Sequence, residues 1–421
     1  MADHSNRKTN WKRKSSDFLV QCFMGVLVIG LLISLIWPDR AFSSLENRPL
    51  QGFPSVSFSS FMDGSAGKKM KDWFEDQFVG RDALIHLNYL ADKASGSKEI
   101  KDVFLGSRTL VGQNKEPQKD VWKKNLKGMQ LLGTKSQLPS YVLAVPGAAD
   151  VQKQKLPAFA PVIADPDYRT ALQEIDNEYV TNIDLYSLLG DHSNEYIFYN
   201  TDHHWTSYGA GLSAQRFFEV RKAVEDSMRS GDDEEQEEEL MRLTQFSALQ
   251  VSDSFQGTYA SKTGSVGISD DVYIYRKTEG EPAYTVRSAD GTKASIYNMA
   301  ALKQKDQYEL FLGKNQALIQ IETDSPYLGR HLLLLKDSYA NSLVQFLLPY
   351  YRTITVVDPR YFYGDIDVLL SSYSISEIMY VFGEDSLTTD NSLSSVLDTY
   401  EGGLYPAENN EDAPAQTSQT E

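Results

Sequence analysis

The sequence predicts an α/β fold in which a mostly parallel β-sheet is covered by helices on both faces. Residues 140–147 ("SYVLAVPG") have the apolar pattern of a buried strand that ends in a turn. Residues 330–362 show strand, turn, helix and strand in succession, and residues 375–383 ("ISEIMYVFG") add a helix and a strand. Strands that alternate with helices favour parallel pairing, because each crossover returns the chain to the same end of the sheet.

The N-terminal 37 residues predict a membrane anchor. Residues 1–17 form a basic tail, and residues 18–37 form an uncharged, mostly apolar run. A helix of about 20 apolar residues is long enough to cross a bilayer, and basic residues before it favour a cytoplasmic N-terminus. We therefore expect a single-pass cell-membrane protein with its main domain outside the cytoplasm. The one cysteine, Cys22, lies in this run, so the exported part has no disulfide.

The rest of the chain is expected to contain two folded regions. Residues 38–100 carry apolar side chains at helical intervals, which predicts a helical membrane-proximal region. Residues 101–395 contain the strand patterns of the α/β domain, including a short strand or hairpin at 103–111 and a strand leading into a loop at 180–189. Residues 256–321 are rich in strand patterns, and they form either an inserted subdomain or one edge of the main sheet.

Negative charge is concentrated in two segments. The net charge is −17, of which residues 225–239 carry −8 and residues 401–421 carry −5. Runs of like charge are typical of solvated segments, so we expect an acidic loop at 225–239 and a disordered tail at 396–421. This charge makes nucleic acid an unsuitable partner.

The segment "TDHHW" (Thr201–Trp205) places two of the six histidines of the chain side by side. Three interpretations compete: a catalytic base, a metal ligand, or packing. A zinc site needs a third ligand, and the remaining histidines are scattered through the sequence. We therefore predict no metal and no cofactor.

A serine after a strand offers the histidine loop a partner. Leu332–Leu335 have the continuous apolar pattern of a central strand, and Lys336–Ser338 form the turn before a helix expected from about Tyr339. Ligands of open α/β sheets bind beyond the carboxyl ends of the strands, although Asp or Ser at such a place is most often a helix cap. Asp202 and His204, two residues apart, are spaced to act as acid and base for Ser338 as nucleophile.

The histidine loop, the serine turn and several other segments together resemble a known protein family. The chain resembles the DHHW protein family, which is similar to the alginate O-acetylation proteins AlgJ and AlgX with their SGNH-hydrolase-like domain. The segments that carry the resemblance are "SSLENRPL", "DWFEDQFVGRDALI", "LAVPGAADVQKQKLP", "TDHHWTSYGA", "FQGTY", "LLLLKDSYANSLVQFL" and "VVDPRYF".

The resemblance implies a three-layer SGNH-hydrolase-like domain with Asp202 as acid, His204 as base and Ser338 as nucleophile. Lys336 departs from the pattern, since many SGNH enzymes have glycine there. Asn341 and Gly147 are candidate oxyanion donors, each equally suited to a structural role.

Four further residues are candidate substrate contacts. Trp205 suits stacking on a sugar or packing in the core, and tryptophan is mostly buried. His203 suits a substrate contact or a hydrogen bond within the loop. Arg360 and Tyr361 follow another strand end, where they line the same crevice or form a structural pair with Asp358.

The sequence thus predicts a membrane-anchored, extracytoplasmic, serine-dependent O-acetyltransferase or acetylesterase that acts on cell-wall or secreted polysaccharide. A transferase implies a multi-spanning acyltransferase partner, because one helix does not carry acetyl groups across a membrane. The alternative is a membrane-anchored carbohydrate-binding or assembly protein without turnover, since a fold does not prove a reaction. Metal-dependent hydrolysis is a third alternative.

Overall fold

The computed structural model describes residues 3–55, 57–228 and 239–404, with only the backbone described for residues 3–16, 19 and 228. The chain divides into two compact units. The first consists of Met1–Lys101 together with Thr258–Ile268, and the second of Asp102–Gly257 and Ser269–Glu421. The predicted boundary at residue 100 lies beside this division, but the return of residues 258–268 to the first unit was not predicted.

The first unit is mainly helical. Its buried Asp76 accepts hydrogen bonds from both terminal nitrogens of Arg48 and from the backbone N–H of Gln51. Trp73 donates to Asp39 at 3.0 Å. The elements are α1 (Asp3–Ile36), β1 (Phe42–Ser43), β2 (Arg48–Pro49), α2 (Phe58–Met62), α3 (Ser65–Gln77), α4 (Arg81–Ala94), β3 (Glu99–Ile100) and α10 (Thr258–Thr263).

The predicted transmembrane anchor finds no support here. In the part of the chain that the structure describes, no helix combines the length and the apolar character needed to cross a membrane. Of the two predicted acidic segments, residues 229–238 and 405–421 lie outside the described residues. Residues 225–228 belong to a helix that ends at Met228, and residues 396–404 are ordered, with Leu397 and Leu404 buried, so the predicted start of the tail at 396 is wrong.

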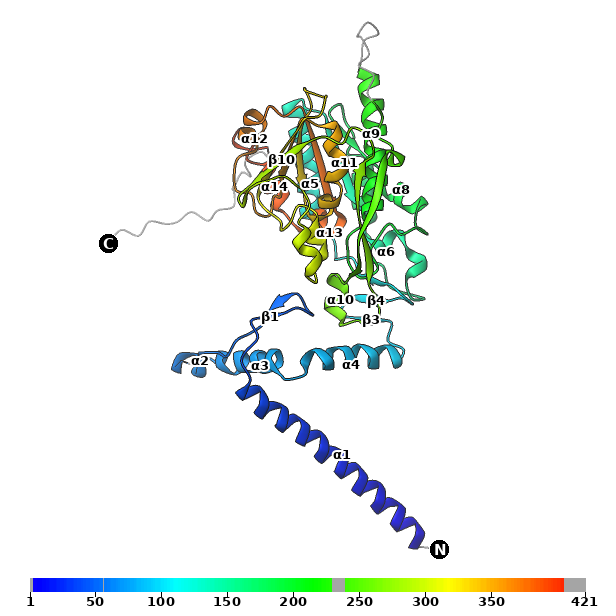
Figure 1. Cartoon of the computed structure of the whole chain (residues 1–421), viewed down its shortest axis with the longest axis vertical. Helices are drawn as coiled ribbons and strands as arrows, with labels where there is room; N and C mark the ends of the chain where they lie inside the picture. The colour runs from blue at the N-terminus through cyan, green and yellow to red at the C-terminus, as the bar shows by residue number, and fades with distance from the viewer. Residues whose placement is uncertain (1–2, 56, 229–238, 405–421) are drawn as a thin grey trace, which may run out of the picture. The chain divides into compact units, whose positions relative to one another are not determined.

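An eight-stranded sheet forms the centre of the second unit (Figure 1). Its order is β11 (Gly291–Lys293), β10 (Tyr284–Ser288), β12 (Leu318–Thr323), β14 (Thr353–Val357), β13 (His331–Lys336), β15 (Glu377–Gly383), β6 (Ser140–Val145) and β7 (Val180–Asn182). The five strands from β14 to β7 pair in parallel, whereas β12, β10 and β11 add to the edge in antiparallel fashion. The sheet is therefore mixed, where the sequence predicted a mostly parallel one.

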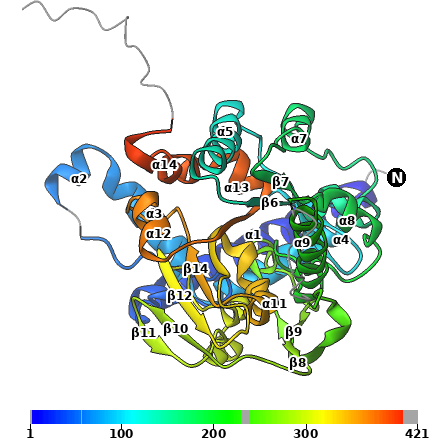
Figure 2. The same ribbon diagram turned by 90° about the horizontal axis from the view of Figure 1, so that it is seen from above.

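Helices cover both faces of this sheet (Figure 2), which confirms the predicted three layers. Along β13, Leu332 and Leu334 join one hydrophobic cluster and Leu333 and Leu335 join the other. Alternate side chains of a strand point to opposite faces, so a strand buried on both sides needs a continuous apolar run. The first cluster includes α6 (Ala148–Val151), α8 (Leu185–Asp191), α9 (Ser207–Met228) and α11 (Val344–Leu347); the second includes α5 (Lys119–Ser136), α7 (Pro166–Gln173), α12 (Ile366–Ser372), α13 (Glu384–Thr389) and α14 (Ser392–Leu397).

Other elements refine the expectations. The segment 103–111 forms the hairpin β4 (Val103–Leu105) and β5 (Leu110–Gly112), as predicted. The stretch at 256–321 contributes to two sheets. Strands β10 to β12 extend the edge of the main sheet, whereas β9 (Asp270–Lys277) pairs with the preceding strand β8 (Phe246–Phe255) in a separate two-stranded ribbon. The remaining turns are 3₁₀: η1 (Lys153–Lys155), η2 (Leu243–Gln245), η3 (Met299–Lys303), η4 (Gln307–Leu310), η5 (Ser338–Ser342), η6 (Leu348–Tyr350) and η7 (Tyr400–Gly402).

Two predicted elements differ from the structure. Only three residues of 180–189 are extended, because Asp184 caps α8 by accepting a hydrogen bond from the N–H of Ser187. The helix expected from Tyr339 is replaced by the 3₁₀ turn η5, the four-residue α11 and the 3₁₀ turn η6, which contains Pro349. Proline lacks an N–H and interrupts a helix.

A buried acid cluster lies after β15. Glu384 is 4% exposed, and burial together with the charge of Asp150 raises its pKa to about 8. Asp150 is held by Arg169 and by the side-chain amide of Asn114. Glu384 is therefore protonated in the folded protein over a pH range in which it is ionised in the unfolded chain.

This cluster predicts how stability depends on pH. Since the pKa of Glu384 rises from an ordinary 4.5 to about 8 on folding, stability should fall as pH increases between these values, by about 1.4 kcal/mol per unit of pKa difference. We expect Glu384→Gln to lessen this loss, so that the variant gains stability relative to the parent between pH 5 and pH 8. Urea unfolding at both pH values measures the effect. Parallel pH profiles for the two proteins would contradict it.

Candidate active site

The histidine loop is a tight turn between α8 and α9. Phe198 and Trp205 form an isolated antiparallel bridge, and the N–H of Tyr199 donates to the carbonyl of His204 at 3.2 Å. The N–H of Thr206 donates to the carbonyl of Ile197 at 2.9 Å. The backbone of the loop is therefore closed on itself before any side chain contributes.

A buried carboxylate anchors this turn. Asp270, the first residue of β9, is 2% exposed and accepts hydrogen bonds from the N–H groups of Asn200 and Thr201 at 2.7 and 2.8 Å. The hydroxyls of Thr201 and Tyr196 donate to it as well, at 2.5 and 2.6 Å. Sequence analysis missed Asp270, because it lies 66 positions after His204 in a segment without a motif.

The serine comes from the carboxyl end of β13. Asp337 caps η5 by accepting from the N–H of Tyr339 at 2.9 Å, and it also accepts from the N–H of Gly383 at the end of β15, again at 2.9 Å. These contacts hold the turn to the neighbouring strand, so the next residue, Ser338, lies at the edge where parallel strands end. Asp337 thus has the capping role that its place before a helical turn suggested.

The structure brings the three predicted catalytic residues together. His204 Nε2 lies 2.8 Å from Ser338 Oγ, and His204 Nδ1 lies 2.5 Å from Asp202 Oδ1. An ionised carboxylate only accepts hydrogen bonds, so Nδ1 of a neutral imidazole carries the hydrogen and Nε2 is left to accept from the serine hydroxyl. We call this set of contacts the Asp202–His204–Ser338 line.

Burial suits this line to general base chemistry. Asp202 and His204 are 3% and 5% exposed, whereas Ser338 is half-buried and remains accessible. A base hydrogen-bonded to a hydroxyl and oriented by a carboxylate is the arrangement that activates a serine nucleophile. The arrangement therefore has the geometry needed for acyl transfer through the hydroxyl of Ser338.

Tyr308, which sequence analysis did not single out, fixes the plane of the imidazole. Its ring stacks on His204 with centroids 3.7 Å apart and an angle of 10°. Its hydroxyl donates to the carbonyl of Ser338 at 3.0 Å. Burial raises the pKa of Tyr308, which keeps the phenol neutral and able to donate. One side chain thus contacts both the base and the nucleophile.

Gly257 allows the chain to pass close to the acid. A Cβ at this position would overlap the side chain of Asp202, and the N–H of Gly257 donates to Thr201 Oγ1 at 3.0 Å. Only glycine fits without displacing the carboxylate. Gly257 lies in "FQGTY", one of the segments that carry the family resemblance, but the sequence did not indicate the role of this glycine.

Of the tentative substrate contacts, Trp205 is placed as a core residue. It is fully buried, and its indole N–H donates to the carbonyl of Tyr339 at 2.9 Å and to Ser342 Oγ at 3.1 Å. A buried indole has no face open to a sugar, so the interpretation as a stacking platform is corrected. Trp205 instead joins the histidine loop to the turn that carries Ser338.

His203 lies at the surface of the site. Its side chain is 37% exposed, its Nδ1 lies 3.4 Å from Asp202 Oδ1, and its carbonyl accepts from the hydroxyl of Tyr339 at 2.6 Å. Desolvation and the adjacent His204 lower the pKa of His203 to about 4, so its imidazole is neutral near pH 7. His203 is thus beside the line without being part of it.

Lys336 organises the neighbouring strand end. Its side chain is 1% exposed, and its ammonium donates to Asn315 and Asn341 at 3.0 Å and to Asp358, after β14, at 3.4 Å. Burial lowers the pKa of Lys336, while Asp358 opposes this shift. The buried ammonium of Lys336 thus binds polar side chains at the strand ends.

Arg360 forms an ion pair with Asp358, which is one of the two roles that the sequence suggested for it. Its guanidinium binds Asp358 through two nitrogens, at 2.8 and 2.7 Å, and its side chain is 29% exposed. Tyr361 is 48% exposed, with the Arg360 guanidinium 5.6 Å from its ring centroid. Both residues lie at the same edge of the sheet as Ser338, because β13 and β14 are adjacent and parallel.

The candidate oxyanion donors are held by other contacts. The amide oxygen of Asn341 accepts from Lys336, and its amide nitrogen lies 3.5 Å from Asn315 Oδ1. Gly147 packs so closely on Asn114 that a Cβ would overlap it.

Asp202, His203 and His204 are also near enough to one another to hold a metal ion, with candidate ligand atoms within 4.8 Å. Zinc sites of this kind use neutral imidazole nitrogens and a carboxylate. Here both ring nitrogens of His204 are already engaged, one by Asp202 and one by Ser338. A metal on this residue would have to break one of the two contacts, which makes the donor set a poor fit.

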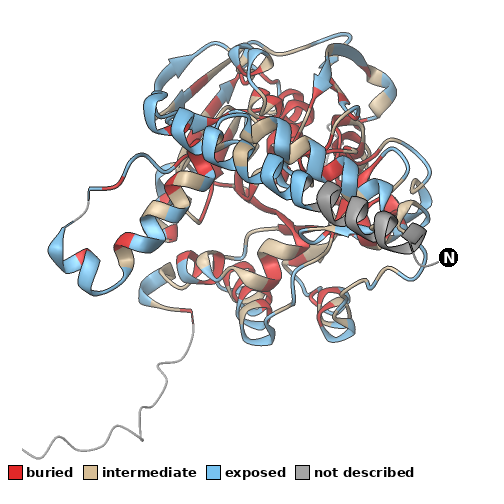
Figure 3. Ribbon diagram, turned by 90° about the horizontal axis from the view of Figure 1, so that it is seen from below, coloured by how far each residue is buried: buried red, intermediate tan, exposed pale blue. Residues whose placement is uncertain are grey.

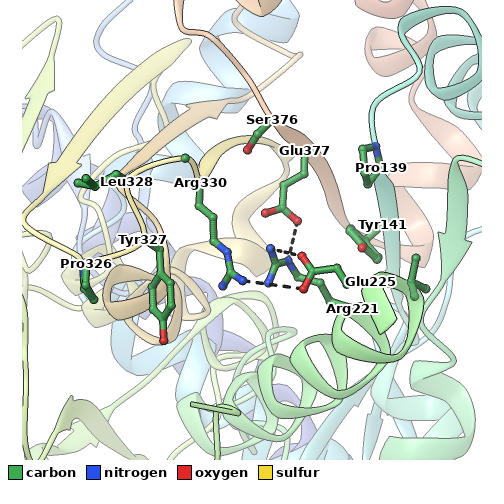
Figure 4. Close-up of a pocket in the computed structure, with 12 residues that line it drawn as sticks. Pro139, Tyr141, Arg221, Glu225, Pro326, Tyr327, Leu328, Arg330, Ser376 and Glu377 are labelled. Carbon is green, nitrogen blue, oxygen red and sulfur yellow. Dashed lines mark hydrogen bonds and ion pairs between the residues drawn. The ribbon is translucent and has the colours of Figure 1, made fainter. Parts of the chain in front are cut away.

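A cavity of about 460 Å³ lies at the opposite, amino end of the parallel strands (Figure 4). Its charged side chains form a chain of ion pairs from Glu377 through Arg221 and Glu225 to Arg330. None of the residues of the Asp202–His204–Ser338 line contributes to its wall. The cavity therefore belongs to a different part of the sheet from the candidate active site.

The α/β domain carries a serine, a histidine and an aspartate at the carboxyl edge of its sheet, and it is similar to SGNH-hydrolase-like domains. More particularly, residues 132–254 match the family model for the SGNH hydrolase-like domain of the acetyltransferase AlgX. No curated protein matches the sequence significantly.

Solved structures support the same fold. A DHHW family protein from Eubacterium siraeum is 22% identical, with 70% of this chain and 96% of that chain covered and a TM-score of 0.51. PatB1 from Bacillus cereus is 17% identical, with 69% and 98% covered and a TM-score of 0.56, and a second PatB1 structure, with a sulfonyl adduct, also has a TM-score of 0.56. The resemblance that the motifs predicted is thereby confirmed.

Gly257 provides a test of the geometry. We expect Gly257→Ala to push the Asp202 carboxylate away from His204 and to slow the reaction of Ser338 with a fluorophosphonate by on the order of 100-fold, since a misplacement of about 1 Å has effects of that size. Gly190→Ala is the matched control, because a Cβ there meets no atom within 4 Å. Equal labelling rates for the two variants would show that the close contact between residue 257 and Asp202 does not position the carboxylate.

Proposed function

We propose that this protein is a serine-dependent carbohydrate O-acetyltransferase or acetylesterase. The observation that carries the proposal is the Asp202–His204–Ser338 line, with contacts of 2.5 and 2.8 Å in a buried setting. The match to the SGNH domain of an acetyltransferase supports the choice of the acetyl group over other acyl groups.

The reaction follows from the positions of the atoms. Ser338 Oγ attacks the carbonyl carbon of an acetyl ester while its proton passes to His204 Nε2, and Asp202 stabilises the resulting imidazolium through Nδ1. Collapse of the tetrahedral intermediate breaks the ester bond, and the leaving alcohol takes the proton from Nε2, which leaves an acetyl-serine. A sugar hydroxyl or water then gives its proton to Nε2 and attacks, so that the product ester or acetate is released and the serine is restored.

The choice of acceptor decides between transferase and esterase. We propose a cell-wall or secreted polysaccharide as substrate, with the exposed side chains of His203, Arg360 and Tyr361 as its nearest contacts on the rim. A neutral His203 and an aromatic ring are suited to hydrogen bonding and stacking on sugars. For a transferase, the acetyl donor would come from a multi-spanning membrane acyltransferase.

The nucleophile is tested by covalent labelling of the full-length protein. We expect a fluorophosphonate or a sulfonyl fluoride to modify Ser338, as mapped by mass spectrometry, and we expect Ser338→Ala to abolish the adduct. His204→Ala should slow labelling by on the order of 100-fold or more, because general base catalysis contributes about 10²- to 10⁴-fold. His192→Ala is the matched control, because its imidazole bonds Glu195 at 2.8 Å rather than Asp202 or Ser338, and it should label at close to the parental rate.

The remaining outcomes separate the alternatives. A folded protein that binds an oligosaccharide but never labels at Ser338 is a carbohydrate-binding or assembly protein. Deacetylation of an acetylated oligosaccharide that persists in Ser338→Ala and stops with a chelator would instead establish metal-dependent hydrolysis. Either result overturns the serine mechanism.

We further propose that the second unit works outside the cytoplasm of a cell in which the N-terminus stays cytoplasmic. Support comes from the sequence alone, in the basic residues before the uncharged run at 18–37, while the described helices do not favour a spanning segment. An alkaline phosphatase fusion at the C-terminus should be active in a bacterial host, because this reporter folds only after export. An inactive but intact fusion would refute export.

A further inference from the structure

Helix α4 turns its apolar side chains outward. Leu84, Leu87 and Leu90 are 50%, 59% and 47% exposed. The inward side carries Tyr89, which is 1% exposed, and His86, whose Nδ1 lies 2.8 Å from the carbonyl of Gly264 in the same unit. A helix at the surface of a soluble unit normally has the opposite distribution, with its apolar stripe facing the core.

Helix α2 shows the same inversion. Phe58, Phe61 and Met62 are 82%, 71% and 70% exposed, whereas Ser60 is buried and takes part in the capping box with Ser57. Three large side chains at positions i, i+3 and i+4 form one side of a short helix. Two separate helices of the first unit therefore present large apolar side chains to the outside.

Between them, the amino-terminal half of α3 carries three lysines, while Asp72, Glu75 and Asp76 in its other half bring the charge of the whole helix to zero. Figure 1 shows α2, α3 and α4 in one row, and the exposed side of α3 carries Lys68, Lys69 and Lys71. Lys71 is partly balanced by Glu75 at 3.4 Å. These lysines stand out in a chain whose net charge is −17. Apolar side chains flanked by lysines are the composition of helices that lie in a membrane interface.

The same unit exposes further apolar surface on α1. Most of the described side chains of this helix are exposed (Figure 3), and they include Phe18, Phe23 and Ile29, each at 59% or more. Helices α1 and α3 belong to one unit, and the N–H of Val79 at its α3–α4 junction donates to Ser34 Oγ of α1 at 3.1 Å. The first unit therefore exposes large apolar side chains on α1 as well as on α2 and α4.

We propose that α2 and α4 lie in the headgroup region of an anionic lipid bilayer, with their outward apolar side chains inserted. We call these side chains the interfacial face: Phe58, Phe61, Met62, Leu84, Leu87 and Leu90. A bilayer fits better than a protein partner because the apolar groups are spread over two helices with lysines between them, and lysines are attracted to an anionic surface. The proposal is independent of the reaction at Ser338 and does not require α1 to cross the membrane.

The test places a nitroxide at single positions of the full-length chain. Because Cys22 is the one cysteine, Cys22→Ser gives a background in which Leu87→Cys and Phe61→Cys are labelled alone. Leu249→Cys on β8 is the matched control, since Leu249 is 57% exposed and Leu87 is 59% exposed. The labelled proteins are bound to vesicles of phosphatidylcholine and phosphatidylglycerol, and collision rates with oxygen and with a water-soluble nickel chelate are compared.

We expect the oxygen-to-nickel ratio at positions 87 and 61 to exceed that at 249 several-fold, with label depths of about 5–10 Å below the headgroups. Ratios equal to that at 249 overturn the proposal. Spectral broadening at 87 that disappears on dilution with unlabelled protein also overturns it, because a second copy would then cover the face. A circular dichroism spectrum equal to that of the parent shows that the fold of each labelled protein is intact, so failure here is distinguishable from failure of the proposed function.

Discussion

Burial of β13 on both faces is the constraint on which the arrangement of the second unit depends. Its four leucines fill two hydrophobic clusters, so a shift of register by one residue would exchange the side chains facing each layer. The strand ends in Lys336, Asp337 and Ser338, and these residues connect it to both neighbours: Lys336 to Asp358 after β14, and Asp337 to Gly383 at the end of β15. The apolar strand thereby determines where the serine lies.

The other half of the site depends on polar anchoring. Asp202 and His204 lie 136 and 134 positions before Ser338, on a turn that Asp270 holds from a different ribbon. Trp205 and Tyr308 then tie this turn to the segment that carries the serine. The base is therefore oriented before any substrate binds, which is the kind of preorganisation that makes transfer of the serine proton efficient.

The two units divide the chemistry of the chain. The second contains the sheet, the two large hydrophobic clusters and the Asp202–His204–Ser338 line. The first is small and helical, is held by partly buried ion pairs such as Arg48 with Asp76, and leaves much of its apolar surface outside. Such a distribution is inefficient for a free soluble unit and effective for one that meets lipid.

The sequence by itself predicted the α/β class, the central strand and the three residues of the line, because apolar periodicity is local, Asp202 and His204 stand two residues apart, and Ser338 directly follows the strand pattern. It also predicted the two regions separated near residue 100. Only the tertiary structure decided that the sheet is mixed, that Trp205 is buried, that Lys336 binds Asp358, and that Asp270, Tyr308 and Gly257 support the site. Each of these depends on contacts between segments far apart in the chain, which periodicity and spacing do not encode.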